Sequence, residues 1–239
     1  MAYWKVINAW GRCRGEGSAN RAAEILKTME AEGVEPDILS YSLVASAWSH
    51  SSDLNATREA EKLLERMEKW AQEKNQAMEE EFYLGLGVAG DNTPSSLRTI
   101  PVRLDLECYN KVLIALSRRQ ESDGPKRALS LLRKMISLAD SGFETVRPTT
   151  KSWNSVLSAL SRDGHPNSVT RAEELLDEMY DMDVTPDAYS FASLLISYQK
   201  RGWPGDPNNA DNIVRTMETM YFDGALSSAP DVYHYTIGK

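Results

Sequence analysis

The sequence predicts an all-α fold, a right-handed α-solenoid of about five helix–turn–helix repeats followed by a truncated sixth. Five segments share the pattern Ala-x-x-[Ile/Leu]-[Leu/Val]-x-x-Met, and an apolar segment that opens with an aromatic residue precedes each of them. In every copy the opening aromatic stands 19 residues before the Ala. Apolar residues at offsets 0, 3, 4 and 7 form one face of an α-helix. Two helices at a fixed spacing therefore form one unit, which buries its apolar faces against its neighbours.

The second helix of each predicted pair contains the segment from the shared Ala to the shared Met. A small side chain at this place lets two antiparallel helices approach closely. The five segments begin at Ala22, Ala60, Ala128, Ala172 and Ala210. The aromatics that open the first helices are Tyr3, Tyr41, Tyr109, Trp153 and Phe191, and a sixth helix opens at Tyr235 and is cut short.

The links between pairs place the repeat boundaries. Most links end in Pro-Asp or a similar pair, in which Pro ends the preceding element and Asp caps the next helix. The predicted repeats are 1–37, 38–105, 106–149, 150–187 and 188–231, with the start of a sixth at 232–239.

The second link is much longer than the others. It contains an insertion at about 75–101 that mixes an acidic run with Gly, Asn, Pro and Ser. This composition predicts a mobile loop on one side of the solenoid. The alternative is that its FYLGLG stretch docks protein effectors.

The composition is that of a globular protein and gives no sign of a membrane or secreted class. Of the 239 residues, 41% are hydrophobic and 26% are charged, and the net charge is −8. No apolar run reaches the roughly 18 residues of a membrane span, and the N-terminus lacks the features of a secretory signal. Because both ends fall inside repeat helices, we expect a fragment of a longer protein.

No pattern in the sequence predicts an enzyme. His50, His165 and His234 are isolated, and no metal-ligand spacing, phosphate loop or nucleophile motif occurs. Cys13 and Cys108 have no partner motif, so neither a disulfide framework nor a metal or redox site is expected. We therefore expect no catalytic residues, no metal, no cofactor and no small-molecule substrate.

The repeat pattern resembles that of the pentatricopeptide repeat family. An aromatic-led first helix, Ala-x-x-Leu-Leu-x-x-Met and a Gly-Val-x-Pro-Asp ending carry the resemblance, which covers nearly the whole chain outside the insertion. The turn within each pair is longer than the family's usual form, which indicates a divergent branch. Tetratricopeptide repeats are the nearest rival, but their Trp-x-x-Leu-Gly-x-x-Tyr pattern is missing. The resemblance implies sequence-selective binding of single-stranded RNA, one base per repeat.

By this resemblance, each base is read by the residue after the opening aromatic together with the last residue of the link. The implied pairs are Trp4 with Asp37, Ser42 with Asp105, Asn110 with Thr149, Asn154 with Asp187 and Ala192 with Asp231. The family's pairings imply guanine for the second unit, a pyrimidine for the third and uracil for the fourth, and they leave the first and fifth unassigned. The alternative is that the link aspartates only cap helices.

A basic stripe supports a nucleic-acid groove without reference to any family. Nine residues after each opening aromatic stands a basic or titratable residue, and these residues are Arg12, His50, Arg118, Arg162 and Lys200. At roughly 100° per residue, this position and the base-reading one lie about 80° apart on the helix, so both can face one groove. We expect these side chains to contact RNA phosphates. The alternative is the favourable placement of a cation at a helix C-terminus.

The net negative charge does not exclude such a groove. The first-helix segments contain ten Lys or Arg residues and one acid, Glu107. The acidic residues therefore lie mainly on the second helices and the links. We expect a basic RNA-binding groove on an acidic protein.

The residue two positions before each opening aromatic is implied by the resemblance to pack between bases. Leu39, Tyr189 and Tyr233 suit this role, whereas Glu107 does not fit it. The resemblance also implies a part in organelle RNA processing, stability, editing or translation, in a mitochondrion or plastid. A protein-interaction scaffold of tetratricopeptide-like type, with the same surface holding a peptide, is the alternative.

Overall fold

The structure is all-helical over the residues that it describes, which confirms the predicted fold class. This computed structural model describes residues 3–13, 15–86, 104–119, 121–163, 165, 167–200, 208–226, 229–231 and 234. The helices there are α1 (Tyr3–Arg12), α2 (Ser18–Ala31), α3 (Ile38–His50), α4 (Ala56–Leu86), α5 (Leu106–Arg118), α6 (Gly124–Asp140), the short 3-10 helix η2 (Glu144–Val146), α7 (Thr150–Arg162), α8 (Ser168–Asp181), α9 (Ala188–Lys200) and α10 (Asn208–Phe222).

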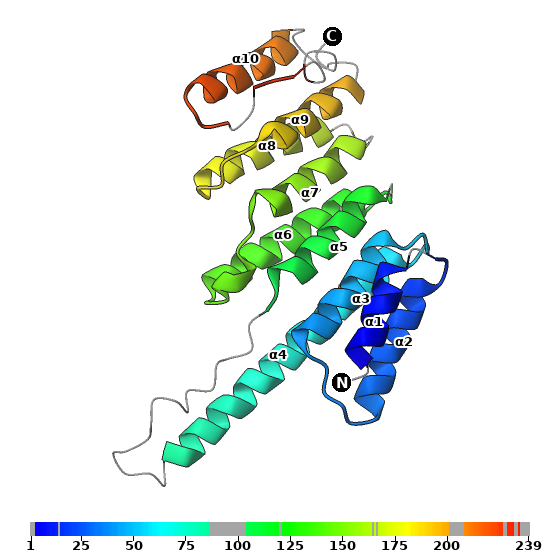
Figure 1. Cartoon of the computed structure of the whole chain (residues 1–239). Helices are drawn as coiled ribbons and strands as arrows, with labels where there is room; N and C mark the ends of the chain where they lie inside the picture. Colours follow the sequence, from blue (N-terminus) through cyan, green and yellow to red (C-terminus); the bar gives the residue numbers. More distant parts are fainter. Residues whose placement is uncertain are drawn as a thin grey trace. The chain divides into compact units, whose positions relative to one another are not determined.

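The chain forms two compact units of stacked helices. The first comprises Met1–Val112 with Leu138–Val146, and the second comprises Leu113–Ser137 with Arg147–Lys239, so α5 and α6 contribute to both. In the first unit, α1 packs against α2 and α3, and α3 packs against α2 and α4. In the second, α7 packs against α8 and α9, and α9 packs against α8 and α10 (Figure 1). In each unit, consecutive first helices thus contact each other directly.

The shared apolar positions form the core, as the repeat pattern predicts. The Ala residues that open the motif on α2, α4, α6 and α8 are completely buried, and so are most of the Met residues that close it. On α7, the side chains of Trp153, Val156, Leu157 and Leu160 are at most 1% exposed. Each side chain of this size that is buried contributes about 1.5–3 kcal/mol to stability. The packing between helices therefore depends on the same positions that define the repeat.

The two short links begin with the same turn at the end of a second helix. After α2, the backbone N–H of Val34 donates to the carbonyl of Met29 at 3.0 Å, and Gly33 adopts φ 73°. After α8, Val184 donates to Met179 at 2.8 Å, but here Asp183 adopts the left-handed φ of 55°. This turn satisfies the last carbonyls of the helix and lets the chain reverse toward the next pair.

The prediction of a loop from residue 75 was wrong for residues 75–86, which continue α4. This stretch lacks Pro, and its Gln, Ala, Met, Glu and Leu residues favour a helix. Gln76 donates to Glu80 at 3.0 Å one turn further on, and Lys74 pairs with Glu35 at 2.6 Å. Residues 87–101, the rest of the predicted insertion, lie outside the described residues. So does the part of FYLGLG that follows Leu86, and with it the predicted docking of effectors.

No helix among the described residues is both long and apolar enough to cross a membrane. No cluster of three or more His, Cys, Asp or Glu side chains among them could hold a metal ion. Cys13 is exposed and Cys108 is buried, and both are free thiols.

Candidate nucleic-acid interface

A groove runs along the first helices of the second unit. It consists of two adjoining pockets of about 440 and 550 Å³ that share Arg118, Ser158, Arg162 and Tyr189. We call this surface the first-helix groove. Its other lining residues are Ile114 and Ser117 from α5, Lys151, Asn154, Ser155 and Ser161 from α7, Asp187 from the link, and Ala192, Ser193, Ile196 and Lys200 from α9.

The basic stripe lies at the C-terminal ends of the first helices, and three of its members line the groove. Arg162 donates from Nη1 to the carbonyl of Ser117, near the end of α5, at 2.8 Å. Lys200 donates from Nζ to the carbonyl of Arg162, the last residue of α7, at 3.2 Å. Each side chain therefore reaches back to the preceding first helix and binds one of its terminal carbonyls, where a cation is favourable.

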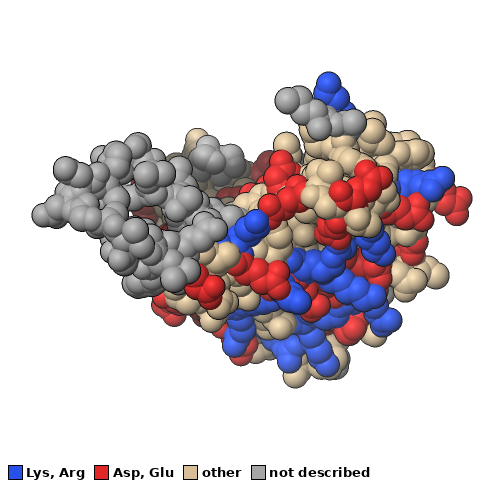
Figure 2. Space-filling view, turned by 90° about the horizontal axis from the view of Figure 1, so that it is seen from below, with Lys and Arg blue, Asp and Glu red and all other residues tan. Residues whose placement is uncertain are grey.

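The charge on this stripe is only partly compensated. Neither Arg162 nor Lys200 forms an ion pair with a carboxylate among the described residues, and each donates instead to a neutral carbonyl oxygen. Cations on the second helices differ, because Arg133 pairs with Glu178 at 3.1 Å and Arg127 pairs with Glu121 at 2.6 Å. Figure 2 shows one face on which Lys and Arg side chains gather with Asp and Glu around them. The groove is thus a place where positive charge remains available to an anion.

The remaining two members of the stripe, Arg12 and His50, belong to the first unit. Both are exposed in the last turn of their helices. His50 contacts the carbonyl of Ser46 on its own helix through Nδ1 at 2.9 Å. His50 thus contacts the C-terminal end of its own helix, which is the alternative to phosphate binding given for this position.

The link residues cap helices, as the alternative interpretation predicted. The Asp37 carboxylate accepts from the backbone N–H of Ser40 at 2.8 Å, and Asp187 accepts from that of Ser190 at 3.0 Å. Thr149 forms a reciprocal capping box with Ser152. Asp105 accepts from the N–H of Glu107 at 3.0 Å and Asp231 from that of His234 at 3.3 Å. Capping does not exclude base reading, because a carboxylate has a second oxygen.

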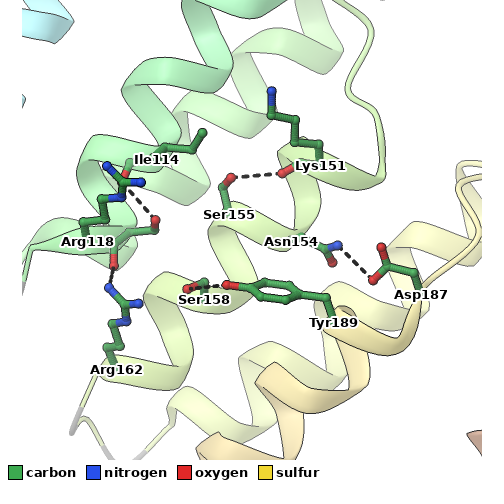
Figure 3. A pocket seen from close by; sticks show the side chains of 10 residues that line it. Ile114, Arg118, Lys151, Asn154, Ser155, Ser158, Arg162, Asp187 and Tyr189 are labelled. Carbon is green, nitrogen blue, oxygen red and sulfur yellow. Dashed lines mark hydrogen bonds between the residues drawn. The ribbon is translucent and has the colours of Figure 1, made fainter. Parts of the chain in front are cut away.

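The fourth predicted pair, Asn154 and Asp187, meets in the groove. Asn154 Nδ2 donates to Asp187 Oδ1 at 2.9 Å (Figure 3). Asn154 is 8% exposed and Asp187 is half-buried, and both line the groove. The two side chains therefore act as one polar group at the wall of the groove.

The other predicted base readers differ widely in their surroundings. Trp4 is 40% exposed on α1, and Ser42 is half-buried on α3. Asn110 is only 2% exposed, and Ala192 is 7% exposed at the groove wall. The apolar side chain of Ala192 offers no hydrogen bond to a base, which agrees with its lack of an assigned base.

Two of the predicted stacking residues are strongly exposed. Leu39 is 51% exposed on α3, and Tyr189 is 54% exposed on α9. Tyr189 lines the groove beside Asn154, and its hydroxyl contacts Ser158 at 3.4 Å (Figure 3). Because the hydroxyl of Tyr189 is held at Ser158, the exposed ring can stack on a base. Tyr233 lies outside the described residues.

A further set of residues, which the sequence patterns did not single out, lies three positions after each link residue. All five are buried, and each contacts its link residue. They are Ser40, Cys108, Ser152, Ser190 and His234. Burial raises the pKa of the Cys108 thiol, with Asp105 adding to the effect. In the sequence, each of these five positions is a small or polar residue within the segment that caps the next helix. Such residues are ordinary at a helix start, so the sequence alone does not distinguish them.

One repeat matches a family profile. Residues 151–184 match the PPR repeat, which corresponds to α7, α8 and most of the link after them. No curated protein matches the chain in sequence at a significant level. The matched stretch contains Asn154 and Arg162 and ends three residues before Asp187.

One solved structure shares the fold. The crystal structure of the pentatricopeptide repeat protein PPR10 from maize aligns with 99% of this chain at a TM-score of 0.56 and 19% identity. This chain spans 26% of the PPR10 chain. PPR10 in complex with an 18-nt psaJ RNA element aligns at a TM-score of 0.24 and 16% identity, over 99% of this chain and 46% of that one, which adds nothing to the fold assignment.

These matches agree with the stacked helical pairs and with the positions of the repeat motif. The fold is the α-solenoid of helical repeats that PPR10 also has, and within it residues 151–184 match the pentatricopeptide repeat.

Proposed function

We propose that the chain binds single-stranded RNA in the first-helix groove, with one base per repeat. The observation that carries the proposal is the convergence of three kinds of group in one groove. Arg162 and Lys200 bring positive charge without a described carboxylate partner, and Tyr189 brings an exposed ring. Asn154 with Asp187 brings a paired donor and acceptor.

Each kind of group matches one part of a nucleotide. Lys and Arg attract the phosphate and release its counterions, which makes the binding depend on salt. An aromatic ring stacks on a base for about 1–3 kcal/mol. Short polar side chains at the groove wall select among base edges by hydrogen bonding. The spacing of one set per helical pair suits a strand that passes along consecutive first helices.

The comparison supports the same class of ligand. PPR10, whose fold this chain shares, has been solved with an RNA element. The proposed biological setting is RNA processing, stability, editing or translation in a mitochondrion or plastid, as the family resemblance implies. The predicted repeats 1–37, 38–105, 106–149, 150–187 and 188–231 are the proposed base-binding units, with guanine, a pyrimidine and uracil for the second to fourth.

The first test removes the cations of the groove. We expect the triple variant Arg118→Ala, Arg162→Ala and Lys200→Ala to bind RNA more weakly and with a smaller dependence on salt. Each lost phosphate contact lowers the slope of log K against log salt by about 0.7 for a single strand, so the slope falls by about 2. Fluorescence anisotropy with an RNA enriched from a random pool measures both quantities.

The matched control removes three cations from the second helices. Lys126, Arg133 and Arg171 line a separate pocket between α6 and α8. Their triple replacement by Ala changes the net charge equally and is expected to change the salt slope little. Thermal melting of both variants separates loss of binding from unfolding. If the random pool yields no enriched RNA, or if both variants bind alike, the groove does not bind RNA, and a peptide-binding scaffold becomes the better proposal.

A further inference from the structure

We propose that Ser190 is a positioning residue, which fixes the amide of Asn154 so that the fourth unit offers a hydrogen-bond donor and not an acceptor to the base. The inference rests on the proposed function and adds a third member to the Asn154–Asp187 pair. Ser190 belongs to the following helix, α9, and is completely buried. It therefore acts on the base only through Asn154.

The hydroxyl of Ser190 determines which end of the amide faces it. Ser190 Oγ accepts a hydrogen bond from the backbone N–H of Asp187 at 3.0 Å, so its own hydrogen is left to donate. The nearer acceptor is Asn154 Oδ1 at 2.6 Å, and the other is Asp187 Oδ1 at 3.1 Å. A donating hydroxyl requires the carbonyl oxygen of the amide and not its nitrogen. Ser190 thus holds the oxygen of Asn154 away from the groove.

Asp187 imposes the same orientation from the other side. An ionised carboxylate only accepts hydrogen bonds. Its Oδ1 accepts from Asn154 Nδ2 at 2.9 Å and from the backbone N–H of Ser190 at 3.0 Å. If the amide turned over, its oxygen would face this carboxylate oxygen, which is repulsive. The Ser190 hydroxyl would also lose its nearer acceptor, at 2.6 Å, and keep only Asp187 Oδ1 at 3.1 Å. The two residues together therefore favour one orientation.

Two groups of the pair are left for a base. The second Nδ2 hydrogen of Asn154 and the Oδ2 atom of Asp187 have no hydrogen-bond partner within the part of the chain that the structure describes. They present one donor beside one acceptor. The imide edge of uracil offers the complement, because a carbonyl oxygen accepts and the adjacent N3–H donates. The adjacent N1–H and N2–H₂ donors of guanine would require two acceptors, which the pair offers only when the amide turns over.

The same arrangement recurs at another link. Cys108 holds the place of Ser190 after the link residue Asp105, and the side chain of Ser42, the predicted base reader of that unit, lies close enough to it to oppose the rise of the Cys108 pKa. The Cys108 Sγ atom also lies 3.7 Å from Asp105 Oδ2. A buried residue that touches both members of a predicted base-reading pair is therefore not peculiar to Ser190. Ser190 combines a hydroxyl with an amide reader whose two ends are both engaged.

The experiment measures discrimination at one nucleotide. The nucleotide that the fourth unit reads is identified in the unmodified protein as the position whose base preference disappears in Asn154→Ala. Affinities are then measured for RNAs with uracil or guanine at that position. We expect Ser190→Ala to lower the uracil-over-guanine ratio roughly fivefold, the effect of one hydrogen bond. Ser190→Thr, which keeps the hydroxyl, is expected to retain the ratio.

The matched control is Ser197→Ala. Ser197 is also buried on α9, but its hydroxyl donates to the carbonyl of Ser193 one turn earlier. This variant loses the same group and is expected to keep the ratio. A purely structural role for Ser190 would weaken binding of both RNAs equally and leave the ratio unchanged, and that result would overturn the inference. Failure of the unmodified protein to prefer any base would instead contradict the proposed function.

A second measurement decides the matter if Ser190→Ala does not fold. In the free unmodified protein, NMR reports exchange of side-chain amide protons with solvent. The Asn154 proton that faces Asp187 is expected to exchange roughly tenfold more slowly than those of Asn212, which is exposed on α10. Equal exchange rates would show an amide that turns freely, and they would refute the fixed orientation.

Discussion

The two short links of the molecule are built alike, yet only one of them forms a polar site. Both span eight residues from the shared Met to the link residue, Met29 to Asp37 and Met179 to Asp187. Both end in an Asp that caps the next helix and contacts a Ser three positions later. The difference lies in the residue that follows the opening aromatic of the preceding helix, Trp4 in the first unit and Asn154 in the fourth.

The aspartate at the end of a link has two separable roles. The Asp37 carboxylate accepts hydrogen bonds from Ser40, whereas that of Asp187 accepts from Asn154 in addition to Ser190. Capping therefore follows from the link alone, and it occurs whatever stands on the preceding helix. A base-reading pair needs a polar partner from that helix in addition. The link sequence by itself consequently does not distinguish a unit that reads a base from one that only folds.

The largest expected effect comes from removing the polar reader. Asn154→Ala is expected to cost about 1–3 kcal/mol of discrimination at its nucleotide, the range for specific side-chain contacts to a base. Trp4→Ala is expected to leave base discrimination unchanged at every position. Affinities for RNAs that differ at a single base test both variants. Equal losses of discrimination in the two would remove the distinction between the links.

The two capping aspartates give a sharper contrast of intermediate size. Asp37→Ala and Asp187→Ala are each expected to lower the free energy of unfolding by about 1 kcal/mol, because each removes a helix cap. Only Asp187→Ala is expected to change base discrimination as well. Urea denaturation and single-base RNA substitutions supply the two measurements. A change of discrimination in Asp37→Ala would mean that the first unit also reads a base.

The smallest effect concerns the turn at the start of each link. Asp183 adopts a left-handed backbone conformation that Gly33 adopts in the first link. Because glycine lacks the Cβ atom that makes this conformation unfavourable, Asp183→Gly is expected to raise the free energy of unfolding by about 0.5 kcal/mol. Gly33→Asp should lower it by a similar amount. Denaturant titration measures both, and RNA binding serves as the control, since neither residue lines the groove.

Repetition made most of the fold predictable. The 19-residue spacing and the Ala-to-Met motif identified the core, because helices that pack in the same way in each unit must bury the same positions. The extent of α4 was not predictable in this way. Residues 75–86 have no counterpart in the other units, and their composition suits either an acidic loop or a helix that continues from a packed one.

The candidate site was predictable residue by residue but not as an arrangement. The sequence singled out Asn154, Asp187 and Arg162 from their places in the repeat. It did not show that Arg162 binds the end of the preceding first helix, because that contact spans 45 residues. Nor did it show that Ser190, which looks like an ordinary residue of a helix start, touches the side chain of Asn154.

The sequence by itself determined the helical pairs, their core and the identity of the polar and basic groups on the first helices. Periodicity suffices for this, since the face that a residue occupies on a helix follows from its spacing. Only the tertiary structure decided which of these groups meet. Asn154 belongs to α7, Asp187 to the link between α8 and α9, and Ser190 to α9. The three residues meet because α7 and α9 pack side by side. Hydrogen bonds act over about 3 Å, so the function of this wall of the groove depends on distances that exist only after the repeats have stacked.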